Sequence, residues 1–347
     1  MSRSGTSPAR CLRALTEVLE GKKRLLIIAH DNPDPDSIAS GWALARVLRR
    51  ICKIQVDFAY GGIIGRAENQ TMTRILEVPV KPLEIVDVES FDAFAMVDCQ
   101  PDTGNSSLPD GVIPTIVIDH HPLRPQTKDS PFYDVREDYG AAASILTEYL
   151  DEADVKVDSR LATALFYAIK TETQNLGREA SRADARAFLK YFTSIDNEAL
   201  SQIENPQISR EYFAMVDQAI AGTRIYSDVA VTILHEVTNP DAVAQFADLM
   251  IRVEKIHWAL TIGRFEQDLL LSLRTNLPSA NAGRVIQQVV GESGTAGGHG
   301  MMAGGKVGGG ASSRTRAAQM ERLLRRQALE ILGVDGRGVR LVRPTRS

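Results

Sequence analysis

Acidic residues and histidines that could bind metal ions directly follow three short apolar runs of the sequence. The runs cover residues 24–29, 91–97 and 113–118, and each is typical of a buried strand in a parallel sheet. In open α/β sheets the ligand lies beyond the carboxyl ends of the strands, so we expect these polar residues to meet at one edge. Together they form a candidate site for two metal ions. They are His30, Asp34, Asp36, Asp98, Asp119, His120 and His121.

The first group lies in residues 30–36, where Pro33 and Pro35 alternate with acidic residues. Proline fixes φ and removes a backbone donor, so we expect a stiff loop that aims Asp34 and Asp36 at separate points. Mixed imidazole and carboxylate ligands favour Mn²⁺, with Mg²⁺, Co²⁺, Fe²⁺ and Zn²⁺ as alternatives. Two ions about 3.5–4 Å apart could share a carboxylate, generate a hydroxide and offset phosphoryl charge. Each residue alone could be a cap, a turn acid or a core histidine, but their occurrence at three strand ends favours metal binding.

Length, charge and cysteine content limit the classes of protein to be considered. The 347 residues correspond to about two domains. The formal net charge of −4 argues against a protein that coats long duplex nucleic acid, but it is compatible with a short anionic substrate. Three cysteines without a C-x-x-C spacing argue against a disulfide framework. No run is apolar enough to cross a membrane and residues 1–20 do not resemble a signal peptide, so we expect a cytoplasmic protein without membrane partners.

Apolar runs that alternate with helical patterns predict an α/β fold with two domains. Residues 1–195 are expected to form a doubly wound, mainly parallel sheet domain, and residues 196–222 a helical linker. Residues 223–347 are expected to form a smaller α/β domain with a mixed sheet, and a cleft would separate the two domains. Further strands are predicted at 53–60, 228–237, 256–265 and 268–274. Helices are predicted at 11–20, 37–50, 66–76, 141–150, 159–169, 241–252, 282–290 and 314–332, with a polar helical region over 182–222.

A glycine-rich stretch over residues 294–310 is the second signal for function. Glycines let consecutive backbone amides approach an anion closely, which predicts a substrate-binding role for Gly298, His299 and Gly300. The histidine could donate a hydrogen bond to a phosphate oxygen. The alternative interpretation is a flexible linker, because glycine-rich stretches usually have that role.

These motifs resemble those of the DHH phosphoesterase superfamily. The resemblance lies in His-x-Asn-Pro-Asp-x-Asp-Ser at residues 30–37, in Asp98 at a strand end and in Asp-His-His at residues 119–121. It is closest to the two-domain branch with a DHH-associated domain, which contains nanoRNA-degrading oligoribonucleases and 3′-phosphoadenosine 5′-phosphate phosphatases. The resemblance implies an α/β metal-binding domain followed by a substrate-binding domain, and pairing into a homodimer is expected.

The resemblance also implies how the ligands are divided between two ions. His30 and Asp34 would hold one ion, Asp36 and His120 would hold the other, and Asp98 would bridge both. The expected ions are two Mn²⁺. This division makes Asp98 the residue on which the whole site depends.

Two residues of the Asp-His-His motif would act in catalysis without binding a metal ion. The resemblance implies that His121 faces the substrate phosphate and that Asp119 orients the histidines. One position departs from the family pattern, because Glu172 stands where the fourth acidic motif has an aspartate. A longer carboxylate could coordinate differently, and the alternative is an acidic residue on a helix surface.

The glycine-rich stretch resembles the G-G-H-x-x-A-A-G motif of the DHH-associated domain, with Met302 in place of its first alanine. In the family this domain binds the substrate. Arg274 matches an arginine that grips the substrate, and its alternative is a surface arginine on a strand.

The activity implied is hydrolysis of short oligonucleotides, or of small nucleotides such as 3′-phosphoadenosine 5′-phosphate, by a metal-activated hydroxide. One alternative is a cyclic-dinucleotide phosphodiesterase. Another is a pyrophosphatase or polyphosphatase, although the superfamily's pyrophosphatases lack the Gly-Gly-His motif found here at residues 297–299. A third is a nucleotide-binding sensor without catalysis, in which Glu172 marks a site that has lost activity.

Overall fold

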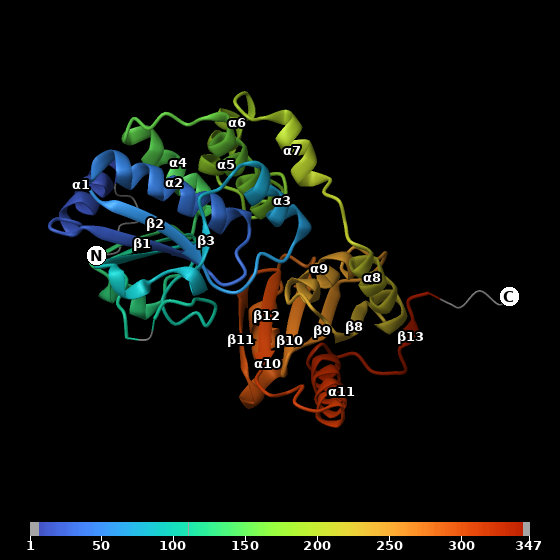
Figure 1. Cartoon of the computed structure of the whole chain (residues 1–347). Helices are drawn as coiled ribbons and strands as arrows, with labels where there is room; N and C mark the ends of the chain where they lie inside the picture. Colours follow the sequence, from blue (N-terminus) through green and yellow to red (C-terminus); the bar gives the residue numbers. More distant parts are fainter. Residues whose placement is uncertain (1–6, 110, 343–347) are drawn as a thin grey trace. The chain divides into compact units, whose positions relative to one another are not determined.

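The computed structural model describes residues 7–109 and 111–342. The chain folds into two compact units, Met1–Pro206 and Gln207–Ser347. Figure 1 shows that each unit is built on its own sheet with helices against it. The first sheet has six strands and is parallel throughout, and the second has seven strands and is mixed. The predicted fold class is therefore confirmed.

The sheet of unit 1 has the strand order β3-β2-β1-β4-β5-β6. The chain builds outward from β1 in one direction and from β4 in the other, so the order reverses between these two strands. In such sheets a ligand site forms where the order reverses, beyond the carboxyl ends of the strands. The strands are β1 (Arg24–Ala29), β2 (Gln55–Tyr60), β3 (Lys81–Pro82), β4 (Ala93–Val97), β5 (Ile116–Asp119) and β6 (Phe132–Val135).

Seven α-helices of unit 1 lie within its described residues. Short 3-10 turns occupy 83–85, 88–90 and 125–129. The α-helices are α1 (Pro8–Val18), α2 (Pro35–Ile51), α3 (Ala67–Ile75), α4 (Ala142–Glu152), α5 (Ser159–Glu172), α6 (Arg182–Phe192) and α7 (Asn197–Glu204).

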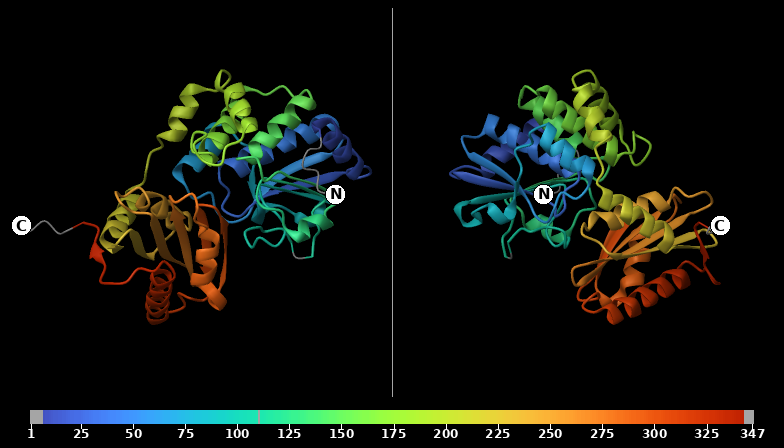
Figure 2. Two further views of the ribbon diagram at one scale, coloured as in Figure 1. Left: turned by 180° about the vertical axis from the view of Figure 1, so that it is seen from behind. Right: turned by 45° about the vertical axis from the view of Figure 1, so that its right-hand side comes forward.

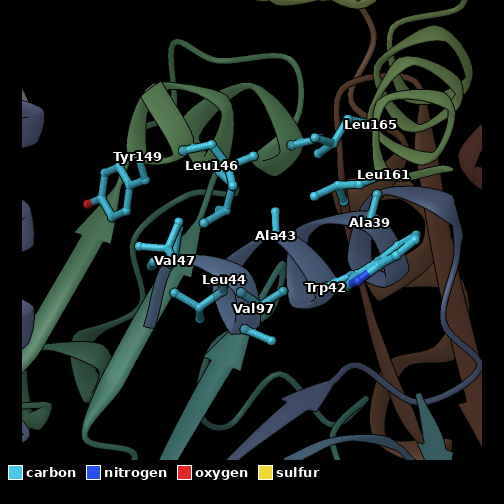
Figure 3. Packing of buried hydrophobic residues seen from close by; sticks show 14 of the residues in the cluster. Ala39, Trp42, Ala43, Leu44, Val47, Val97, Leu146, Tyr149, Leu161 and Leu165 are labelled. Carbon is cyan, nitrogen blue, oxygen red and sulfur yellow. The ribbon is translucent and has the colours of Figure 1, made fainter. Parts of the chain in front are cut away.

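Helix α2 lies at the centre of this unit and packs against α4 and α5. Figure 3 shows Ala43 of α2 between Leu146 of α4 and Leu161 of α5, with Ala39 beside Leu161. Small residues on α2 allow the helices to approach closely. On the side of α2 that faces the sheet, Gly41 allows a similar approach, because a Cβ atom there would lie 2.2 Å from the ring of Phe58 of β2. This packing fixes the start of α2, which carries two of the predicted metal ligands.

The sheet of unit 2 has the strand order β11-β12-β10-β9-β8-β7-β13, and β8 and β9 are its parallel pair. The apolar residues of α10 and α11 cover one face, and those of α8 and α9 cover the other, as Figure 2 also shows. The strands are β7 (Thr223–Tyr226), β8 (Val229–Glu236), β9 (Trp258–Phe265), β10 (Asp268–Thr275), β11 (Thr295–His299), β12 (Met302–Val307) and β13 (Val339–Arg340). The helices are α8 (Arg210–Gly222), α9 (Asp241–Met250), α10 (Ala282–Val290), α11 (Arg314–Ile331) and a 3-10 turn at 291–293.

The glycine-rich stretch forms a hairpin of two strands, β11 and β12, which pairs with β10. The flexible-linker interpretation is therefore wrong. Gly298 and Gly300 have φ values of 148° and 44°, which residues with a side chain rarely adopt. Gly298 lies within β11, opposite Ala303, and Gly300 lies in the turn of the hairpin. The turn contacts α10, where the Ala282 amide donates to the Gly300 carbonyl at 2.8 Å.

Residues 196–222, predicted as a helical linker, contain the two helices α7 and α8. Helix α7 packs against α3 and α5 of unit 1, and α8 packs against β8 of unit 2. Residues 205–209 connect these two helices. In the described part of the chain, no helix combines the length and apolar character needed to cross a membrane.

Candidate metal centre

The predicted ligands come from the carboxyl ends of three adjacent strands and from the start of one helix. β1 pairs with β4, with Ala29 opposite Val97, so His30 and Asp98 follow neighbouring strands. β4 pairs in turn with β5, which ends at Asp119. The edge-of-sheet arrangement expected from the sequence is therefore present in the structure.

Asp34 and Asp36 belong to the start of α2 and not to a loop, which corrects the expectation for residues 30–36. Asp34 is the N-cap, and its Oδ1 accepts a hydrogen bond from the Ser37 amide at 3.0 Å. Pro35 occupies the first helical turn, where a missing N–H costs nothing. The prolines thus start a helix that holds both carboxylates rigidly.

The first group of donors consists of His30, Asp34 and Asp98. His30 Nε2 lies 3.7 Å from Asp34 Oδ1 and 3.8 Å from Asp98 Oδ2. The other ring nitrogen, Nδ1, lies 3.0 Å from the Asp31 carbonyl oxygen. A carbonyl can only accept, so Nδ1 donates and Nε2 faces the two carboxylates. A histidine held in this way is prepared to bind a metal ion through Nε2.

The second group consists of Asp98, His120 and His121. His120 Nε2 lies 3.5 Å from Asp98 Oδ1, and His121 Nδ1 lies 3.9 Å from the same oxygen. His120 Nδ1 is 3.1 Å from the Tyr139 carbonyl oxygen, so this ring is also fixed with Nε2 toward the site. Both groups therefore use the same pattern of a carbonyl behind an imidazole.

Asp98 is shared by the two groups and presents a different oxygen to each. Its side chain is 3% exposed, and its backbone has a φ of 57°, a left-handed conformation that is uncommon outside glycine. Among the described residues, neither Asp98 Oδ1 nor His120 Nε2 has a hydrogen-bond partner, although both atoms are buried. Unpaired buried polar atoms are costly, and a cation between them would satisfy both. The donor set is thus compatible with two divalent ions that share Asp98.

Asp36 has a second role that the sequence did not reveal. Its Oδ2 accepts the amide of Ala142 at 2.7 Å, and its Oδ1 accepts the amide of Ala143 at 2.8 Å. These amides begin α4, whose own N-cap residue provides no side-chain hydrogen bond. Asp36 Oδ2 also lies 3.9 Å from His120 Nε2. The carboxylate therefore caps α4 while it lies at the edge of the second donor group.

Asp119 orients His121, and a glutamine that the sequence analysis missed orients Asp119. Asp119 Oδ1 lies 2.9 Å from His121 Nδ1 and accepts the His120 amide at 2.8 Å. Gln100, which is 1% exposed, donates to Asp119 Oδ2 at 2.6 Å. Its Oε1 accepts the Arg124 amide, which fixes the turn after the motif. Gln100 follows Asp98 by two residues, so its position at a strand end was the available signal.

The carboxylates of this cluster are buried and lie close enough to repel one another. Burial and the nearby charges of Asp36 and Asp34 raise the pKa of Asp98 well above its ordinary range. Burial also raises the pKa of Asp36 to about 7, against the lowering effect of His120. For Asp34, burial is outweighed by the hydrogen bond and charge of His30, so its pKa is lowered. Such a cluster is stabilised by a bound cation.

The histidines respond to the same carboxylates. Burial lowers the pKa of His30, but the hydrogen bond and charge of Asp34, with Asp98, raise it to about 10. For His121, burial is likewise outweighed by Asp119, and its pKa rises to about 9. The His121 side chain is 38% exposed, against 15% for His30 and 7% for His120. His121 is therefore the histidine of the site that a substrate can reach most easily.

Glu172 lies at the last turn of α5 and pairs with Arg178. Its Oε1 is 3.3 Å from Arg178 Nη2, and its charge acts on both Asp36 and His120. It is not part of either donor group among the described residues. The structure therefore places Glu172 near the second group with its carboxylate engaged by an arginine.

Arg274 of unit 2 lies on β10 and is already bound to other groups. Its Nε donates to Asp248 Oδ1 at 2.6 Å, and its Nη1 donates to Ser272 Oγ at 2.8 Å. The side chain is 12% exposed. Arg274 pairs with Met302 of the glycine-rich hairpin, so it lies beside the predicted substrate-binding glycines. His299 is on β11, and its side chain lies outside the described part of the structure.

Comparisons with known proteins identify the family of the chain. The sequence profile of the DHH family, N-terminal domain, matches residues 24–169, which include every residue of both donor groups. An uncharacterized protein of Methanocaldococcus jannaschii is 34% identical over 333 residues, covering 94% of this chain and 67% of that protein. A probable manganese-dependent inorganic pyrophosphatase of Bacillus pumilus is 28% identical over 156 residues. That match covers 43% of this chain and 48% of the pyrophosphatase, so this chain matches about half of its length.

Two solved structures share the fold. An exopolyphosphatase-related protein from Bacteroides fragilis superposes with a TM-score of 0.71 at 13% identity, covering 95% of this chain and 99% of that chain. RecJ from Thermus thermophilus in complex with Mn²⁺ gives a TM-score of 0.50 at 16% identity, covering 92% of this chain and 55% of that chain. At these identities the likeness concerns the fold alone.

Proposed function

Because this chain belongs to the DHH family, we propose that it is a metal-dependent phosphoesterase that hydrolyses short oligonucleotides or small nucleotides such as 3′-phosphoadenosine 5′-phosphate. The family and the pyrophosphatase relatives support the broader class, a hydrolase of phosphoesters or phosphoanhydrides that uses divalent ions. The nucleotide substrate is our inference from the sequence motifs of both units.

The observation that carries the proposal is the position of Asp98 between two donor groups. One carboxylate oxygen faces His30 and the other faces His120, at 3.8 Å and 3.5 Å. A bridging carboxylate is what a pair of nearby divalent ions requires. When bound, such ions would lower the pKa of a water molecule and offset the charge of a phosphoryl group. Mn²⁺ is the ion that we propose, because imidazole and carboxylate donors are mixed.

The remaining residues orient His121 and supply a hydrogen-bond donor to the substrate. His121 holds a proton at Nδ1 against Asp119 Oδ1, at 2.9 Å, and its exposed ring would bind a phosphate oxygen of the substrate. Gln100 keeps Asp119 in place, so the ring of His121 cannot turn freely. The site thus combines fixed metal donors with one histidine directed to the substrate.

We further propose that unit 2 binds the substrate through Arg274 and the glycine-rich hairpin at Gly298, His299 and Gly300. The support is local: Arg274 of β10 lies directly opposite Met302 of β12. Backbone amides of a glycine turn can approach an anion without obstruction by side chains. This part of the proposal requires Arg274 to exchange Asp248 for the substrate.

A second candidate is hydrolysis of pyrophosphate or polyphosphate, which the manganese-dependent pyrophosphatase relatives favour. Those relatives match only 43% of this chain, and the glycine-rich hairpin remains to be explained under that candidate. The nucleotide proposal accounts for both units and is therefore preferred.

The test is one activity panel with Mn²⁺, using dinucleotides to pentanucleotides, 3′-phosphoadenosine 5′-phosphate, cyclic dinucleotides and pyrophosphate. We expect turnover of the short oligonucleotides or of 3′-phosphoadenosine 5′-phosphate. Turnover of pyrophosphate alone would support the second candidate, and turnover of cyclic dinucleotides alone would change the substrate class. Tight nucleotide binding without any product would contradict the enzyme proposal and favour a sensor.

A further inference from the structure

A partly buried network of charged and polar side chains lies behind His120 and is not used by the proposed chemistry. Arg136 donates from Nε and Nη2 to the carboxylate of Asp134, with distances of 2.8–3.1 Å. Its Nη1 donates to Glu148 Oε2 at 2.6 Å and to the Tyr139 hydroxyl at 3.1 Å. The Tyr139 hydroxyl in turn donates to Glu148 Oε1 at 2.8 Å. Three side chains thus enclose the Arg136 guanidinium.

This network joins the metal centre at two backbone positions. The Arg136 amide donates to the Asp119 carbonyl at 3.0 Å, directly before His120 in the chain. The Tyr139 carbonyl accepts Nδ1 of His120 at 3.1 Å. The same tyrosine therefore has its hydroxyl in the network and its carbonyl on the imidazole of His120.

The next residue, Gly140, is held from the opposite side. Its amide donates to Asp184 Oδ2 at 2.8 Å, and Asp184 is fully buried. A Cβ atom at Gly140 would lie 2.8 Å from the Glu179 carbonyl oxygen, so no other residue can be accommodated there without movement. The peptide that carries the Tyr139 carbonyl is consequently fixed at both of its ends.

Stability alone does not account for this network. Asp134 is 0% exposed and Arg136 is 6% exposed, so both charges have lost most of their hydration. The cost of removing two charges from water largely cancels their attraction, and apolar residues of similar size often stabilise a fold as well. What the ion pair provides, in contrast, is a fixed direction for every group that it contacts.

We propose that Asp134, Arg136, Glu148 and Tyr139 form a positioning network for His120. The network fixes the Tyr139 carbonyl, and that carbonyl sets the ring so that Nε2 faces Asp98 and Asp36. Behind His30, the corresponding carbonyl belongs to Asp31, whose side chain accepts a hydrogen bond from the Ser107 hydroxyl. Among the described residues, no comparable charged network supports that carbonyl. The inference rests on the proposed function, and it predicts that the two halves of the centre depend differently on Tyr139.

The test is the titration of metal-free protein with Mn²⁺ by calorimetry, which reports each binding step without catalysis. His120→Ala identifies the step that belongs to the His120 half. Tyr139→Phe then removes one hydroxyl from the network and retains the ring and the carbonyl. We expect it to weaken that step by about tenfold, the lower end of the effect of outer ligand partners. The step at the His30 half should remain within about twofold.

Tyr133→Phe is the matched control, because Tyr133 lies on the same strand as Asp134 but packs on the other face with Met96 and Val117. It should leave both steps unchanged. Glu148→Gln serves as a second variant of the network if Tyr139→Phe does not fold. Equal effects on both steps, or a Tyr139→Phe protein indistinguishable from the control, would overturn this inference alone. A wild-type protein that binds no Mn²⁺ would instead contradict the proposed function.

Discussion

The strand ends of unit 1 and strand β10 of unit 2, beside the glycine-rich hairpin, differ in whether their polar side chains already have hydrogen-bond partners. In unit 1, buried atoms of Asp98 and His120 have no hydrogen-bond partner among the described residues. In unit 2, Arg274 is bound by Asp248 and Ser272. The first region therefore needs a ligand to become satisfied, whereas the second must give up a partner to bind one. Under the proposed function, metal binding would prepare unit 1, and substrate binding would require Arg274 of unit 2 to leave Asp248.

The strongest test of the first half of this comparison is Asp98→Asn. Asparagine tolerates the left-handed backbone at this position, where φ is 57°, so the fold should survive. Loss of the shared charge removes the several kcal/mol that paired ions contribute to the transition state, and kcat should fall by about a thousandfold or more. Steady-state kinetics with Mn²⁺ measures the effect. Full activity in this variant would exclude the bridging role.

Arg274→Ala tests the second half of the comparison. If Arg274 exchanges Asp248 for the substrate, its loss should raise KM by about tenfold to a hundredfold, as for one hydrogen bond to a charged group, with little change in kcat. Arg264→Ala is the matched control, because Arg264 lies on the adjacent strand and pairs with Glu321 of α11. Equal kinetic effects of the two substitutions would assign Arg274 a structural role.

Glu172→Ala sharpens the division within unit 1. We expect it to lower the affinity of one Mn²⁺ ion by about tenfold, because its charge acts on Asp36 and His120 even while it pairs with Arg178. Calorimetric titration gives the affinity of each ion. Glu204→Ala is a suitable control, since Glu204 of α7 pairs with Lys170, which lies on the same helix as Glu172. Two ions bound as in the wild type would remove Glu172 from the site.

The smallest expected effect is a pH dependence of metal-induced stabilisation. Asp36 has a pKa of about 7 in the folded chain against an ordinary value of 3.8, so its contribution to stability is lost as the pH rises through that window. His30, with a pKa of about 10 against 6.5, loses its contribution between those values. Asp34 and Asp119 have lowered pKa values, so their contributions to stability are lost only under more acidic conditions.

Metal-free unit 1 should therefore become less stable as the pH rises from about 4 to about 10, and a divalent ion should replace the protons that are lost. We expect Mn²⁺ to raise Tm by more at about pH 8.5 than at about pH 6.5. Thermal unfolding with and without Mn²⁺ at both pH values measures this difference. An identical shift at both would show that the ion binds without displacing protons from these residues.

The parts of the fold that the sequence predicted are those in which burial dominates. Runs such as residues 24–29 are apolar because both faces of a parallel strand are covered, and that pattern is visible without a structure. Strand β6 was missed because Asp134 interrupts it, and only the distant Glu148 and Tyr149 show why a charge is tolerated there. The hairpin at residues 295–307 was missed because glycine has a low strand propensity.

The candidate site shows the same limit. Strand ends place His30, Asp98 and His120 together, and this juxtaposition follows from a general property of parallel sheets. The capping of α4 by Asp36 joins residues 106 positions apart. Contacts of this kind depend on how helices pack, so local sequence patterns do not predict them.

The hydrogen bonds from Ala142 and Ala143 to Asp36 offer a way to detect whether a metal ion binds to this carboxylate. A cation bound to the Asp36 carboxylate would change the strength of the hydrogen bonds that this carboxylate accepts from the two amides. The deuterium-exchange rates of these two amides should therefore differ between protein with and without Mn²⁺, in the absence of substrate.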